Sequence, residues 1–150
     1  MKFFAAIAAL VVAAVANAQT QPTWSNCATG STDLTITTFS VTPYPLCIGQ
    51  NVCASGTGTL STPVVAGAKL AITGRYGGRV VYTDNQDLCS LTGGQGHPCP
   101  IPITVTSITV CLLVKTTAPA NVPVALTVLA TNGNGNVLFC QAATVTAKVC

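Results

Sequence analysis

Charged side chains are scarce in this 150-residue sequence, which contains no glutamate and only three acidic residues, Asp33, Asp84 and Asp87. With six lysines and arginines, 6% of the residues are charged, whereas about a quarter is usual in a soluble domain. The formal net charge is only +3 at pH 7. A nucleic-acid partner would require basic residues clustered along one face, so we expect no such partner.

The residues that most catalytic sites need are also missing. His97 is the single histidine, and the sequence has neither a Gly-x-Ser-x-Gly motif nor a glycine-rich phosphate loop ending in Lys and Ser or Thr. No Cys-x-x-Cys pair occurs, and His97 has no neighbouring ligand that would complete a zinc site. We therefore expect no enzyme, no metal and no cofactor. A lone histidine in a loop is more often inert than a pH switch.

No apolar run is long enough to cross a bilayer comfortably, including the N-terminal one, where Lys2 precedes an apolar stretch up to Val15. Ala16-Asn17-Ala18 follows, with small residues at the two positions that signal peptidase recognises. These features predict a signal peptide over residues 1–18 and one domain over residues 19–150. We expect the mature protein to be secreted, or to reside in the lumen of the vacuole or endolysosome.

Cysteine, by contrast, is abundant. All eight cysteines follow the predicted signal peptide, which favours four disulfides formed in an oxidising compartment. Their spacing alone fixes none of the pairings. The eight residues are Cys27, Cys47, Cys53, Cys89, Cys99, Cys111, Cys140 and Cys150.

Apolar residues in the mature chain alternate with a period of two, as in 34–38, 70–73 and 124–128, which is typical of β-strands. Thr and Val are frequent, and no amphipathic helix is evident. The Asn- and Gly-rich segment 132–136 predicts a hairpin. Together these features predict an all-β, immunoglobulin-like sandwich of about seven strands. The expected strands are 33–41, 50–59, 67–76, 78–83, 103–114, 122–131 and 136–149.

Several motifs occur in order along nearly the whole mature chain. The most specific is Asp87-Leu88-Cys89 followed shortly by Cys99-Pro100-Ile101. The others are Phe39-Ser-Val-Thr-Pro43-Tyr-Pro45, Gly49-Gln50, Ser55-Gly-Thr-Gly, Gly67-Ala-Lys-Leu-Ala-Ile-Thr-Gly-Arg-Tyr76-Gly77 and Leu138-Phe-Cys140. This series resembles the ML domain, the MD-2-related lipid-recognition family, which includes sterol carriers and fungal phosphatidylglycerol/phosphatidylinositol transfer proteins.

The resemblance implies two disulfides, Cys89 with Cys99 and Cys27 with Cys140. Four cysteines are then left. Because the sterol-carrier branch has a disulfide near the start of the second strand, the first choice for the remaining pairs is Cys47–Cys53, with Cys111–Cys150 following by elimination. The family pattern has no counterpart for Cys111 or Cys150.

The resemblance also implies an apolar cavity between the two sheets, which a sterol or acyl chains would occupy. Strand alternation and the family match together predict the lipid-binding residues Leu70, Ile72, Val81, Val114, Ala118, Pro119, Leu126 and Val128. The sterol carriers have aromatic rings at the positions of Val81 and Ala118. The smaller side chains here favour phospholipid, or a mixed set of lipids, over a sterol alone.

The expected function is therefore lipid binding and transfer by a secreted protein, as a monomer in transient contact with membranes. Arg75 and Arg79 are candidate ligands for an anionic headgroup, although isolated arginines are more often solvated surface residues. The alternative is a secreted structural or interaction module, such as a wall-associated protein or an inhibitor, with a closed core and no lipid. A void on the order of several hundred Å³ would favour the carrier, and a close-packed core would favour the alternative.

Overall fold

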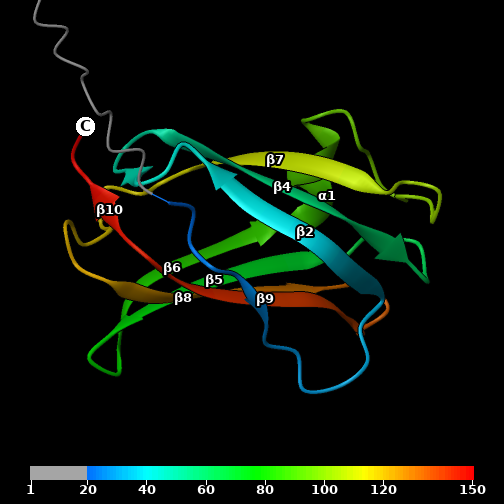
Figure 1. Ribbon diagram of the computed structural model, residues 1–150. Coiled ribbons are helices and arrows are strands. Elements are labelled where there is room, and N and C mark those ends of the chain that lie inside the picture. Colours follow the sequence, from blue (N-terminus) through cyan, green and yellow to red (C-terminus); the bar gives the residue numbers. More distant parts are fainter. Residues whose placement is uncertain (1–19) are drawn as a thin grey trace, which may run out of the picture.

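Two β-sheets face each other in the computed structural model, which describes residues 20–150 (Figure 1). The predicted signal peptide, residues 1–18, lies outside the described residues. The larger sheet has five strands in the order β1 (Ser25–Asn26), β9 (Val137–Val145), β8 (Val124–Thr131), β5 (Lys69–Tyr76) and β6 (Arg79–Asp87). The smaller sheet has three strands in the order β2 (Leu34–Thr42), β4 (Asn51–Leu60) and β7 (Ser107–Leu113).

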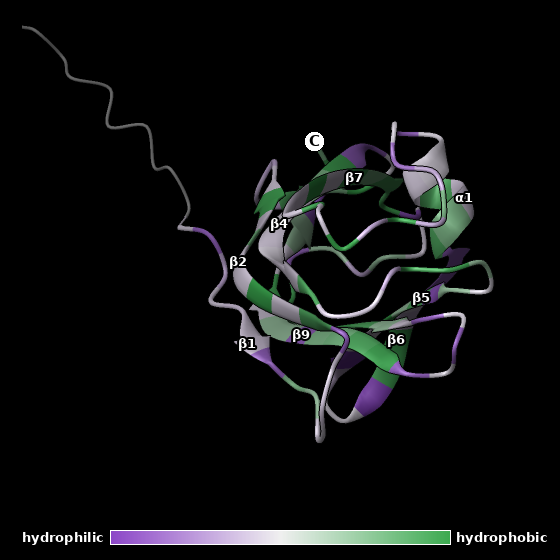
Figure 2. Cartoon of the chain, turned by 90° about the vertical axis from the view of Figure 1, so that its right-hand side faces the viewer, coloured by the Kyte–Doolittle hydropathy of each residue, from purple (hydrophilic) through white to green (hydrophobic). Residues whose placement is uncertain are grey.

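Two short elements complete the architecture. Strands β3 (Leu46–Cys47) and β10 (Ala147–Lys148) pair in parallel, and the helix α1 (Leu88–Gly93) follows β6 directly. In Figure 2 the two sheets curve around a common interior, and α1 lies at one edge of it. No helix within residues 20–150 has both the length and the apolar character needed to span a bilayer.

The predicted β-sandwich is confirmed, and each of the seven expected strands is present with shifted ends. The helix α1 was not among the elements expected from the sequence, in which no amphipathic helix is evident. This helix is only six residues long, too short to produce a visible 3.6-residue period. Its N-terminus is set by Asp87, whose side chain accepts a hydrogen bond from the backbone N–H of Ser90 at 2.8 Å. The three two-residue strands β1, β3 and β10 were also not predicted separately.

A β-bulge changes which residues of β2 face the other sheet. The register of β2 against β4 shifts between Ile36 and Thr38, so one extra residue lies on β2 at this point. Beyond the bulge, Phe39 and Val41 face the interior, although a strict alternation from Ile36 would have directed them outward. The bulge therefore adds an aromatic ring to the space between the sheets.

At one end of the sandwich, the buried Asp33 joins the start of β2 to the β8–β9 hairpin. Its carboxylate, in a residue only 7% exposed, accepts hydrogen bonds from the side-chain amides of Asn132, Asn134 and Asn136 at 3.0, 3.3 and 3.2 Å. The amide of Asn132 contributes most to holding the pKa of Asp33 below its ordinary value, against the opposing effect of burial. This end of the sandwich is thus closed by a polar network.

Four disulfides link the eight cysteines. Two pairs, Cys27–Cys140 and Cys89–Cys99, are those implied by the family resemblance. The other two expected pairings are wrong, because the structure links Cys47 to Cys150 and Cys53 to Cys111.

The physical reason lies in strand pairing. Cys53 on β4 stands directly opposite Cys111 on β7, and β10 brings the C-terminus alongside Cys47 on β3. Sequence spacing contains no information on which strands become neighbours in this way.

Candidate functional site

A cavity of about 190 Å³ lies between the two sheets and is lined almost wholly by apolar side chains. The three-stranded sheet contributes residues of β2, β4 and β7, and the five-stranded sheet contributes residues of β5, β8 and β9. Native cores seldom contain voids much larger than a water molecule, and an engineered apolar cavity of about 150 Å³ can bind benzene. The space is therefore large enough for a ring or a segment of an acyl chain, but smaller than the several hundred Å³ expected for a lipid carrier.

A second cavity of about 80 Å³ adjoins the first near the loop between β7 and β8. The two spaces share a partition of apolar side chains, so movement of a few of them would join the two volumes. The shared residues are Leu46, Val52, Ile72, Leu112, Leu126 and Val145.

Seven of the eight predicted lipid-binding residues line these cavities. Leu70, Ile72, Leu126 and Val128 line the larger one, and Val114, Ala118 and Pro119 line the smaller one. That these side chains contact a lipid remains a prediction.

Val81 lines neither cavity, in contrast to the sequence-based expectation. The register between β5 and β6 shifts after Gly74, which pairs with Tyr82, while the next residue, Arg75, pairs with Val80. Val81 is consequently the extra residue of a bulge, and Tyr82 and Asp84 are the β6 residues that line the smaller cavity.

Sequence reasoning missed the wall formed by the three-stranded sheet. On β4 the lining residues include Val52, Ala54, Gly56 and Gly58, an alternation in which small side chains leave space between the sheets. This period-two pattern of small residues was the available signal.

Gly58 cannot be replaced without strain, because a Cβ atom there would lie 2.3 Å from the backbone oxygen of Thr35. A Cβ atom on Gly56 would come no closer than 3.7 Å to the nearest atoms, on Phe39 and Thr38. Gly58 is therefore needed because any side chain would clash with the backbone of β2, whereas the position of Gly56 has room for a Cβ atom.

Aromatic residues close one side of the larger cavity. Trp24 and Phe39 both line it, and their rings meet edge to face with centroids 4.7 Å apart. The indole Nε1 of Trp24 is buried and has no hydrogen-bond partner among the described residues. Trp24, which is absent from the predicted lipid-binding residues, is thus part of the cavity wall.

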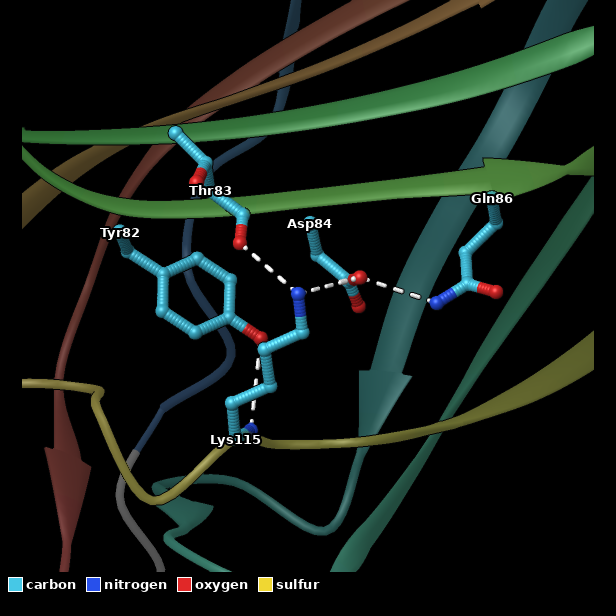
Figure 3. Close-up of polar contacts among 5 residues, drawn as sticks. All are labelled: Tyr82, Thr83, Asp84, Gln86 and Lys115. Carbon is cyan, nitrogen blue, oxygen red and sulfur yellow. Dashed lines mark hydrogen bonds and ion pairs between the residues drawn. The ribbon is translucent and has the colours of Figure 1, made fainter.

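A polar cluster lies beside the smaller cavity, where β6 and β7 form the adjacent edges of the two sheets (Figure 3). Lys115, just after β7, places its ammonium 2.9 Å from Asp84 Oδ1 and 3.1 Å from the Thr83 carbonyl oxygen, to which it donates a hydrogen bond. Gln86 Nε2 donates to the same Asp84 oxygen at 2.9 Å. The hydrogen-bonded ion pair between Lys115 and Asp84 raises the pKa of Lys115.

Tyr82 belongs to the same cluster. Its hydroxyl oxygen accepts a hydrogen bond from the backbone N–H of Lys115 at 3.4 Å, and burial is the main reason that the pKa of Tyr82 is raised. Together the contacts of Tyr82 and Asp84 with Lys115 join β6 to the segment that follows β7, and β6 and β7 themselves share no backbone hydrogen bonds.

Arg75 and Arg79, the candidate headgroup ligands, are exposed near the β5–β6 turn and line neither cavity. Strand registers place them, with Lys115 and Lys148, at the end of the sandwich that carries the smaller cavity. We call this end the basic end. Asp84 lies beside Lys115, whereas Asp33, Asp87 and Lys69 lie at the opposite end, so positive charge exceeds negative charge at the basic end.

A family model of the ML domain matches residues 21–147, which is most of the chain. The chain belongs to the ML-domain family. The fold of this ML-domain protein resembles that of a Niemann-Pick type C2 protein from the Japanese carpenter ant, with a TM-score of 0.66 and 14% identity over 84% of this chain and 99% of the other. Chicken MD-1, solved in complex with lipid IVa, has a TM-score of 0.52 and 13% identity, covering 82% and 86% of the two chains.

A sequence relative of the ML-domain protein is the Dictyostelium discoideum protein named "Putative phosphatidylglycerol/phosphatidylinositol transfer protein 2". The two are 32% identical over 78 residues, which cover 52% of this chain and 53% of the relative. The match thus spans about half the length of that curated protein.

Proposed function

We propose that this ML-domain protein binds a lipid, a sterol or a phospholipid, between its sheets and transfers it between membranes. The main support is the pair of adjoining apolar cavities of about 190 and 80 Å³. The names of relatives give further support, since one is called a phospholipid transfer protein and another was solved with a bound lipid.

The energetics of an apolar cavity favour exchange rather than permanent capture. Burying an acyl chain of about sixteen carbons gains more than ~10 kcal/mol relative to water, at about 0.8 kcal/mol per CH₂ group. A bilayer solvates the same chain equally well, so transfer from a membrane into the protein is close to balanced. A protein with such a cavity therefore releases its lipid to a second membrane as readily as it takes one up.

A whole sterol or acyl chain requires more space than the larger cavity provides. The sheets have no backbone hydrogen bonds to each other between β6 and β7, so this edge of the sandwich can widen without breaking a strand ladder. We therefore propose that binding widens the β6–β7 edge.

Trp24 offers a polar contact within the larger cavity. Its Nε1–H has no partner among the described residues and would donate a hydrogen bond to an acceptor on the ligand.

The basic end is the surface that we propose contacts the membrane. Its cations are Arg75, Arg79 and Lys148, together with Lys115, whose charge is balanced by Asp84. Strand registers place the exposed Tyr76, Val80 and Leu113 at the same end. Cations attract anionic lipids, and exposed apolar side chains enter the headgroup region. Contact through this end would bring the smaller cavity close to the bilayer.

We also propose that the protein acts outside the cell, or in the lumen of the vacuole or endolysosome. Four disulfides persist in oxidising compartments and are rare in the cytosol. The predicted signal peptide and the monomeric state remain predictions. The alternative of a closed-core structural module fits less well, because such a core would leave no space of about 190 Å³ between the sheets.

The proposal is tested with protein purified from its native secretion. Mass spectrometry of organic extracts identifies any bound lipid, and a transfer assay between vesicles follows a fluorescent lipid. We expect a stoichiometric lipid and transfer that increases with protein concentration. An extract without lipid, together with no transfer above the spontaneous rate, would exclude lipid carriage.

A further inference from the structure

The Asp84–Lys115 pair is the one ion pair formed within residues 20–150. Asp84 lines the smaller cavity and Lys115 extends from it toward solvent, and we call this side of the cavity its mouth. The Asp84 side chain is 4% exposed, whereas that of Lys115 is 44% exposed. Lys115 therefore extends from solvent to the carboxylate of Asp84, which is almost completely buried. A group that entered the smaller cavity from the side of Lys115 would meet Asp84 in the cavity lining.

A buried carboxylate in an apolar wall is unfavourable unless a partner neutralises it. Here the partners are Lys115 and the amide of Gln86, and both bind Oδ1. The second oxygen, Oδ2, has no partner among the residues drawn in Figure 3. The hydroxyl of Tyr82 accepts a hydrogen bond from the Lys115 backbone, so its own proton is free to be donated.

These groups set the charge that a lipid headgroup would encounter. The ammonium of Lys115 is already balanced by Asp84, so the mouth has no net positive charge to attract a phosphate, and an anionic group would approach the carboxylate at close range. A hydroxyl, by contrast, can accept from Tyr82 and donate to Asp84.

We propose that Asp84 is a specificity-determining residue, which excludes anionic headgroups from the smaller cavity and admits an uncharged lipid end that carries a hydroxyl. This inference rests on the proposed function, because it requires that a lipid enters the cavities. The basic end can still attract an anionic membrane, since Arg75, Arg79 and Lys148 lie outside the cavity linings. The surface that binds the membrane and the site that selects the cargo thus have different charge preferences.

The test compares two probes with the same apolar part, a pyrene-labelled dodecanol and its phosphate monoester. Wild-type protein is expected to bind the alcohol more tightly. Asp84→Asn removes the carboxylate and leaves Lys115 unbalanced, so the affinity ratio should shift toward the phosphate by about tenfold or more. The double variant Asp84→Asn/Lys115→Gln is again uncharged at the mouth and should return the ratio toward that of the wild type.

The matched control is Asp87→Asn, the same substitution at an exposed aspartate of β6 that lines neither cavity. Asparagine caps a helix about as well as aspartate, so α1 should be retained and the ratio should not change. Melting temperatures verify that each variant is folded. If Asp84→Asn binds the two probes with the same affinity ratio as the wild type, the proposed role of Asp84 is wrong, whereas the proposal of lipid carriage is not affected. If wild-type protein binds neither probe, the inference is wrong, and lipid carriage is wrong as well if the native extract contains no lipid and vesicle transfer stays at the spontaneous rate.

Discussion

Replacing Ala54 with phenylalanine tests whether the larger cavity is the binding site. Ala54 lies in the middle of the three-stranded sheet, opposite Val41 on one side and Val110 on the other, and its side chain lines the cavity. Phenylalanine would place a benzene-sized ring in a space of about 190 Å³. The ring should therefore enter the cavity rather than push the sheets apart.

The expected change in stability is small. An unfilled cavity costs ~24 cal/mol per Å³, so a space of about 190 Å³ corresponds to about 4–5 kcal/mol of packing that is not realised. A ring that fills roughly half of it would recover about 2 kcal/mol, and local strain would cost about 1–3 kcal/mol. We expect the free energy of unfolding to change by less than about 1–2 kcal/mol.

The effect on binding should be much larger. A ring displaces about five CH₂ groups of a ligand, each contributing about 0.8 kcal/mol, which corresponds to a loss of several hundredfold or more in Kd. Titration with pyrene-labelled dodecanol measures the Kd, and chemical denaturation measures stability. Thr59→Phe, an exposed position of β4 outside both cavity linings, is the control and should leave the Kd unchanged. Undiminished binding by Ala54→Phe would show that the ligand lies elsewhere, and a stability loss well above 3 kcal/mol would show that the space is not open.

Three further predictions concern the framework. Asp33→Asn should reduce stability at pH 7 by about 1–3 kcal/mol. The folded-state pKa of Asp33 lies below the ordinary 3.8, so the ionised side chain stabilises the fold at pH values above 3.8. This stabilisation is lost as the pH falls through the folded-state pKa. Thermal melts from pH 5 to 2 should therefore show a weaker acid dependence in Asp33→Asn than in the wild type. Gly58→Ala should lower the denaturation midpoint markedly, whereas Gly56→Ala should be tolerated, because only the former brings a Cβ within 2.3 Å of a backbone oxygen. Non-reducing peptide mapping should yield Cys47–Cys150 and Cys53–Cys111, and peptides joining Cys47 to Cys53 would contradict the β3–β10 pairing.

The sequence predicted those features that depend on neighbours along the chain. Alternation along β5 and β8 was sufficient to place Leu70, Ile72, Leu126 and Val128 on the interior face. Val81 was expected from the family match rather than from alternation, and it lines neither cavity. Tyr82 and Asp84 line the smaller one, so alternation along β6 directs Val81 away from it.

Features that depend on neighbours in space were not accessible in this way. Asp84 and Lys115 meet only because β6 and β7 become adjacent edges of different sheets. The pairing of Cys53 with Cys111 depends likewise on which strands are neighbours, and the motifs of the family resemblance contain no equivalent of Cys111.

The distribution of the disulfides has a mechanical consequence. Cys53–Cys111 lies within the three-stranded sheet, Cys27–Cys140 ties the segment after β1 to β9, and Cys89–Cys99 closes the loop after α1. None of these bonds joins a strand of one sheet to a strand of the other. Cys47–Cys150 links β3 to the C-terminal residue, just after β10, which pairs with β3. No disulfide joins β6 to β7 within residues 20–150, and beside the smaller cavity this edge is held by side-chain contacts such as those of Lys115 with Asp84 and Tyr82. The β6–β7 edge is therefore the part of the framework that yields first when the sheets move apart.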